Sequence, residues 1–167
     1  MRRLCICLLA GCAASSADEA LDDIIPSYSA SDFAVCAACH LDDGAGVPGA
    51  FPPLRSRSAR MAALDGGREY LITVASFGLM GTIQVDGQSY AGVMPGHAGS
   101  MHADAIAAAL NYLVFELNDD ARAADNVKPF SAREVDAVQA NTAGGNPMTA
   151  GELRNTLLVR HGQKWPH

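Results

Sequence analysis

The segment Cys36-Ala37-Ala38-Cys39-His40 constrains this chain more than any other feature of its sequence. Two cysteines at this spacing lie about one helical turn apart, where their thiols can form thioether bonds with the two vinyl groups of one haem. The imidazole of the next residue can then bind the iron, as a proximal histidine does. The motif therefore predicts covalent haem attachment through Cys36 and Cys39, with His40 as an axial ligand.

Two cysteines at this spacing also have other uses in proteins. They can form a disulfide, a thioredoxin-like redox pair or half of a zinc site. A zinc site would need two further ligands at suitable spacing, and a thioredoxin-like pair should follow a strand in a β-α-β pattern. Neither pattern is visible in the sequence, so haem attachment is the favoured interpretation, while a redox or metal use of the thiols stays open.

Length, composition and charge narrow the class of protein further. The 167 residues suffice for one domain. Hydrophobic residues make up 49% of the chain but aromatic residues only 6%, so a buried porphyrin would add apolar mass that the side chains lack. The formal net charge is -6, which argues against nucleic acid and anionic membrane surfaces as partners.

The N-terminal residues resemble an export signal. Two arginines precede an apolar run that is far shorter than the roughly twenty residues of a membrane-spanning helix. The run ends in Leu-Ala-Gly-Cys at Cys12, which resembles a bacterial lipobox; cleavage after Ala17, leaving a soluble protein, is the alternative. We expect a signal peptide at residues 1–11, a flexible leader at residues 12–30 and a periplasmic protein, with a membrane tether if Cys12 is lipidated.

A second informative stretch is Phe51-Pro52-Pro53-Leu54, which follows a glycine-rich loop. Prolines lack an N–H and hold the backbone extended, so the carbonyls here are free to accept hydrogen bonds. A ligating imidazole normally donates its second ring nitrogen to such an acceptor. We expect His40 to donate to the carbonyl of Pro52, with Leu54 packing beside the ring. A stiff surface turn is the simpler alternative.

The second axial ligand is expected in the stretch around Met94. Composition predicts a loop there, stiffened by Pro95, from which a thioether could be directed at the iron. Met80, which also has glycine neighbours, is the main rival. His97 and His102 could instead give a site with two histidine ligands and a lower potential, but both lie where exposed polar residues are expected.

Helix and strand signals predict a largely helical chain. Apolar periodicity, capping residues and glycine stops predict helices at residues 32–38, 68–77, 102–117, 132–140 and 150–160. Ser31 would cap the first of these helices and Phe33 and Val35 would approach the core. Asp86-Gly87 predicts the turn of a short hairpin that covers one edge of the cofactor without forming a sheet.

Together these features resemble the class I c-type cytochromes, in particular bacterial monohaem domains that serve as subunits of periplasmic dehydrogenases or as donors to terminal oxidases. The similar segments are residues 36–40, 51–54, 81–87, 90–95 and 106–112. The resemblance implies an all-α, cytochrome c-like haem domain at residues 31–120 with a short hairpin. Residues 121–167 would form a C-terminal extension with two extra helices, and residues 139–167 match no familiar segment.

The resemblance also implies a site and a function. One covalent haem c would be ligated by His40 and Met94. The haem contacts would include Cys36, Cys39, Phe51, Pro52, Leu54, Ile83 and Tyr90. With both axial positions filled by protein atoms, we expect an electron carrier and not an enzyme.

The expected partners are redox proteins, namely a dehydrogenase, an oxidase or a quinol-oxidising complex of a respiratory chain. One alternative is a fixed cytochrome subunit of such a complex, with the terminal helices as its interface. A second alternative is a haem-based gas or redox sensor, which would need a labile Met94.

Overall fold

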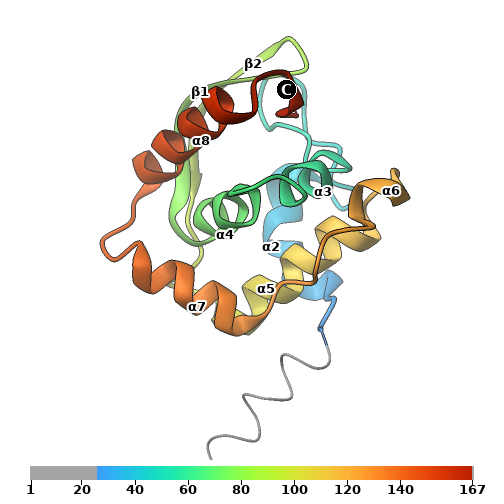
Figure 1. Ribbon diagram of the computed structural model, residues 1–167, viewed down its shortest axis with the longest axis vertical. Coiled ribbons are helices and arrows are strands. Elements are labelled where there is room, and N and C mark those ends of the chain that lie inside the picture. Colours follow the sequence, from blue (N-terminus) through green and yellow to red (C-terminus); the bar gives the residue numbers. More distant parts are fainter. Residues whose placement is uncertain (1–25, 167) are drawn as a thin grey trace, which may run out of the picture.

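The computed structural model describes residues 26–166. The predicted signal peptide, Cys12 and most of the predicted leader lie outside these residues. The described part is mostly helical and contains one two-stranded antiparallel sheet (Figure 1). Within it, no helix combines the length and the apolar sequence that crossing a bilayer would require.

The helices that the sequence predicts are present, with shifted ends. In chain order the elements are α2 (Ala30–His40), α3 (Arg57–Ala62), α4 (Gly67–Phe77), β1 (Gly78–Val85), β2 (Gln88–Pro95), α5 (Ala103–Asn111), a π-helical turn (Tyr112–Glu116), α6 (Ala121–Ala124), α7 (Ala132–Asn141), α8 (Pro147–His161) and a 3-10 turn (Gly162–Lys164). The short helices α3 and α6 were not predicted. Gly78 and Gly162 end α4 and α8, as expected.

Helix α2 begins earlier than the sequence suggested. The side chain of Ser29, and not that of Ser31, accepts a hydrogen bond from the backbone N–H of Asp32 at 3.1 Å. The predicted cap was therefore wrong by two residues. Ser31 instead lies 2.9 Å from Ser29, hydroxyl to hydroxyl.

One face of α2 is buried. Phe33, Ala37 and His40 follow the spacing of a single helical face and are all buried. Val35 is 45% exposed, contrary to the expectation that it approaches the core. Two residues along a helix correspond to about 200°, so Phe33 and Val35 face opposite sides.

Strands β1 and β2 correct the prediction of an all-α fold. They pair antiparallel from Gly78 opposite Pro95 to Val85 opposite Gln88, eight residues on each side. The predicted turn is present, and both of its residues, Asp86 and Gly87, have positive φ, as a tight hairpin turn of this kind requires. The hairpin is longer than predicted because its glycine- and methionine-rich ends carry little strand signal.

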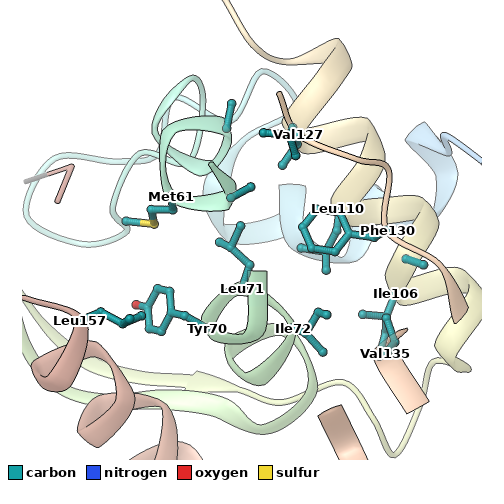
Figure 2. Packing of buried hydrophobic residues seen from close by; sticks show 14 of the residues in the cluster. Met61, Tyr70, Leu71, Ile72, Ile106, Leu110, Val127, Phe130, Val135 and Leu157 are labelled. Atoms are coloured by element: carbon teal, nitrogen blue, oxygen red, sulfur yellow. The ribbon is translucent and has the colours of Figure 1, made fainter. Parts of the chain in front are cut away.

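The main core surrounds α4. Leu71 and Ile72 lie at its centre in Figure 2, with Tyr70 and Leu157 at one end and Ile106 and Val135 at the other. Residues of the predicted C-terminal extension belong to this same core. Val135 of α7, Leu157 of α8 and Trp165 after it are each at most 1% exposed.

Two further packing contacts position the ends of α2 and the hairpin. A smaller apolar cluster of Phe33, Ala37, Ala109 and Leu113 joins α2 to α5 and the π-helical turn. Helix α8 lies along the hairpin in Figure 1, and Arg154 donates from its guanidinium to the carbonyl of Gln84 at 3.0 Å. The hairpin therefore lies between α8 and the region of the C-x-x-C-H motif.

Candidate functional site

Cys36, Cys39 and His40 lie in the last two turns of α2. Both cysteines are free and half-buried. Burial raises the pKa of the Cys36 thiol, and the neighbouring Cys39 adds to this effect. A redox-active pair of the thioredoxin type instead needs a lowered thiol pKa, so this environment does not favour that alternative.

A zinc site also gains no support. Within residues 26–166 no group of three or more histidine, cysteine, aspartate or glutamate side chains is arranged to hold a metal ion. A tetrahedral zinc site needs three or four such ligands.

The ring of His40 is fixed by the hydrogen bond that the sequence predicted. Its Nδ1 lies 2.8 Å from the carbonyl oxygen of Pro52, and the residue is 5% exposed. With Nδ1–H donated to Pro52, Nε2 carries the free lone pair. Burial lowers the pKa of His40, and the hydrogen bond to Pro52 raises it by less. The imidazole is thus held neutral, the form that binds iron.

The backbone at Gly46 approaches residues 51 and 52 closely and thereby holds the Pro52 carbonyl in position. Gly46 has φ +70°, and a Cβ there would lie 2.5 Å from the carbonyl oxygen of Phe51 and 2.7 Å from that of Pro52. Its N–H donates to the His40 carbonyl at 2.9 Å. A glycine is therefore required for the loop to hold the Pro52 carbonyl next to the end of α2.

A cavity of about 310 Å³ opens beside His40, in the size range of ligand sites. It lies between the end of α2, residues 50–52 and the hairpin. The predicted site residues that line it are Cys39, His40, Phe51, Pro52, Ile83, Tyr90 and Met94.

Two predicted haem contacts do not line this cavity. Leu54 packs against the cluster that contains Phe33 and Ala37, and its position beside the ring stays a prediction. Cys36 lines a second, smaller cavity, which it shares with His97 and Met101.

The pairing register of the hairpin places the thioethers of Met94 and Met80 on different faces of the strands. Directly opposed residues of an antiparallel pair share a face, and successive pairs alternate between faces. Met94 is opposite Leu79, and both line the cavity. Met80 is opposite Val93, is 44% exposed and does not line the cavity. Met94 therefore lies within strand β2 and not in the predicted loop, and its rival Met80 lies on the other face.

The rival histidines lie away from the cavity that contains Met94. His97 is half-buried in the smaller cavity, where burial lowers its pKa. His102 is exposed and precedes α5. Neither residue shares a cavity with His40.

Sequence reasoning missed several residues of the hairpin wall. Leu79, Gly81, Ala91, Gly92, Val93 and Pro95 also line the cavity. Counting outward from the Asp86-Gly87 turn in steps of two would have found part of this wall, because Ile83, Gly81 and Leu79 then fall opposite Tyr90, Gly92 and Met94. It would not have found Ala91, Val93 and Pro95, which lie between these positions on β2.

The donor set fits a covalently attached haem. The thiol of Cys39, a buried neutral imidazole and a thioether line one mostly apolar cavity, and the imidazole is oriented through its second nitrogen. The second thiol, Cys36, lies about one helical turn before Cys39 on α2. Soft sulfur and imidazole donors of this kind are the usual protein ligands of haem iron.

Two curated bacterial proteins are similar to this chain. Cytochrome c-552 from one strain of Thermus thermophilus is 42% identical over 133 residues, which cover 80% of this chain and 82% of that protein. A second Cytochrome c-552 of Thermus thermophilus is 45% identical over 108 residues, which cover 65% of this chain and 81% of that protein. No protein-family model matches the chain.

Proposed function

Since the chain belongs to the class I c-type cytochromes, we propose that it carries single electrons through one haem c ligated by His40 and Met94. Cytochromes of this class are electron carriers that bind haem c covalently. The observation that carries the proposed ligation is that one cavity is lined by His40 from α2 and by Met94 from β2.

Each of these residues has a defined task in the proposed carrier. Cys36 and Cys39 anchor the cofactor to α2, and His40 is held in place by Pro52. Met94 supplies the sixth ligand, and a thioether in that position raises the reduction potential. The bound haem supplies one-electron exchange between ferric and ferrous iron. The apolar side chains of Leu79 and Ile83 keep water from the ligand side of the cavity.

The packing of the terminal helices favours a carrier over a fixed subunit. A fixed subunit was expected to use these helices as its interface, yet the apolar residues Leu157 and Trp165 are buried in the chain's own core. We propose redox proteins of the bacterial periplasm as partners. The exposed apolar residues Leu41, Val47 and Phe51, which surround the end of α2, are available for contact with them.

Absorption spectra of the purified holoprotein test this proposal. The oxidised protein should show the weak near-infrared band of sulfur bound to ferric iron. Met94→Ala should abolish this band and lower the reduction potential, whereas Met80→Ala should leave both unchanged. Loss of the band in Met80→Ala, or its persistence in Met94→Ala, would contradict the ligation. A spectral change when carbon monoxide is added to the reduced wild-type protein would favour the sensor alternative.

A further inference from the structure

Gly92 lies in the middle of strand β2, where glycine is unfavourable. It is paired with Gly81 of β1, and the next pair on the same face is Leu79 with Met94. Glycine is depleted from strand interiors because it loses more backbone entropy than other residues and has no side chain to pack. The two opposed glycines therefore leave a part of the hairpin without side chains on the face that Met94 shares.

The other glycines of the hairpin are required by the polypeptide itself. Gly87 has φ +77° in the tight turn, and Gly81 has φ +114°, a backbone conformation that residues with a side chain rarely adopt. A Cβ at Gly78 would collide with the carbonyl oxygen of Met94. Backbone conformation or a close contact thus excludes larger residues at each of these three positions.

Neither reason applies to Gly92. Its φ lies outside the left-handed region, and in the described part of the chain no atom beyond its sequence neighbours lies within 4 Å of a Cβ at this position. Alanine would fit there and would stabilise the strand, because it reduces the conformational freedom of the unfolded chain. The polypeptide alone therefore does not account for glycine at position 92.

A Cβ at position 92 would point toward the cavity beside His40. Alternate residues of a strand share a face, so this Cβ would project on the side of Tyr90 and Met94, and all three residues line the cavity. Gly92 precedes Met94 by two residues, which correspond to about 7 Å along a strand. A glycine in a strand interior often marks a place where a ligand approaches the backbone closely.

We propose that Gly92 leaves room for the porphyrin to lie against the backbone of β2, and that it thereby sets how closely Met94 approaches the iron. This inference rests on the proposed function. The backbone that meets the ring and the thioether that binds the iron belong to one short strand. A side chain at position 92 would therefore push the hairpin, and Met94 with it, away from the cofactor. Gly92 acts on the iron through Met94 and is a positioning residue.

The proposal reverses the expected effect of a simple substitution. In the polypeptide alone, Gly92→Ala should raise Tm, because the unfolded chain loses conformational freedom. In the holoprotein, the added methyl group would crowd the porphyrin, and overpacking of a filled site is destabilising. Tm of the holoprotein should therefore fall, and the bond from Met94 to the iron should weaken.

Displacement of Met94 by added imidazole measures this bond in the ferric holoprotein. Loss of the near-infrared band of sulfur-bound iron reports the displacement as imidazole is titrated. Gly92→Ala should bind imidazole about ten- to a hundredfold more tightly than wild type, the range expected for one extra methyl group in a filled site. Gly92→Val should show a larger effect of the same sign.

Gly99→Ala is the matched control. Gly99 also has φ outside the left-handed region, and in the described residues no atom lies within 4 Å of a Cβ there. It lies in the turn after His97 and lines neither the cavity beside His40 nor the smaller one. This variant should keep the imidazole affinity of wild type and should not lose Tm.

An imidazole affinity of Gly92→Ala equal to that of wild type and of Gly99→Ala would overturn the proposal, whatever its Tm, because a lower Tm alone would be a structural effect. If Gly92→Val yields no holoprotein, Gly92→Ala decides, since it adds a single methyl group. Failure of the proposed function gives a different result. A wild-type protein without the near-infrared band overturns the ligation and this inference together. A band that Met94→Ala abolishes, with Gly92→Ala behaving as wild type, overturns this inference alone.

Discussion

Replacing Gly46, whose backbone lies against Phe51 and Pro52, should destabilise the protein by a predictable amount. In Gly46→Ala, the left-handed backbone costs an alanine roughly 1–2 kcal/mol. The new Cβ would lie 2.5 Å from the Phe51 carbonyl oxygen and 2.7 Å from that of Pro52, so the loop must move away. Weakening the bond from His40 to Pro52 costs about 1 kcal/mol more. The free energy of unfolding should fall by about 2–3 kcal/mol, which lowers Tm by roughly 4–12 °C in a chain of this size.

Gly49→Ala is a matched control. Gly49 has φ +77°, but the nearest atom to a Cβ there is Nε2 of Gln88 at 3.8 Å. This variant should lose only the roughly 1–2 kcal/mol of backbone strain. Both substitutions change the unfolded chain in the same way, so their difference isolates the crowding at Pro52.

The assay measures two quantities in each variant. Thermal unfolding followed by circular dichroism gives Tm, and redox titration gives the reduction potential. A weaker hydrogen bond makes His40 a poorer donor to ferric iron, so the potential of Gly46→Ala should rise, while that of Gly49→Ala should not change. Equal losses of stability and equal potentials in the two variants would refute the argument that Gly46 positions Pro52.

Two further predictions concern the cap of α2 and the buried Tyr70. Ser29→Ala should lower the free energy of unfolding, measured by chemical denaturation, by about 1 kcal/mol. Ser31→Ala should lower it by clearly less, because Ser29 and not Ser31 accepts a hydrogen bond from the N–H of Asp32. Equal losses in the two variants would contradict this assignment of the cap. Burial raises the pKa of Tyr70, so the folded state favours the neutral phenol. The stabilisation is complete below the unfolded-state pKa of about 10 and is lost as pH rises toward the folded-state value. Stability measured between pH 9 and 11 should therefore fall, and Tyr70→Phe should reduce this fall; an identical fall in the variant would show that another group is responsible.

The parts of this molecule that sequence predicts well are local. The C-x-x-C-H motif, the Asp86-Gly87 turn and the capping of α7 by Ser131 depend on neighbours within a few residues. The His40–Pro52 hydrogen bond spans twelve residues, yet it follows from the chemistry of a proline carbonyl and a ligating imidazole. Short-range chemistry of this kind does not depend on the packing of distant segments.

The errors have identifiable physical causes. Val35 was assigned to the core because it is apolar, although helical geometry places it opposite Phe33. Helix α3 has six residues and no apolar periodicity, so no pattern marks it. Met94 was placed in a loop because glycine and proline surround it, whereas pairing with β1 holds that segment extended.

The long-range contacts could not be read from the sequence. Leu157 and Trp165 fill the core around α4, about ninety positions away from Tyr70. Apolar periodicity shows that such residues are buried but not what they are buried against. The contribution of the C-terminal helices to the core around α4 therefore emerges only from the folded structure.

The two-sided hairpin limits the changes that this chain can accept between residues 78 and 95. On β1 the alternate residues Leu79, Gly81 and Ile83 meet the cavity and those between them do not, and the two sets interchange if the strand is shifted by a single position. Insertion of one residue before Met94 would turn its sulfur to the opposite face of the strand. Natural variants of this hairpin should accordingly change in length by matched additions on both strands near the turn, and hardly ever by one residue on one side.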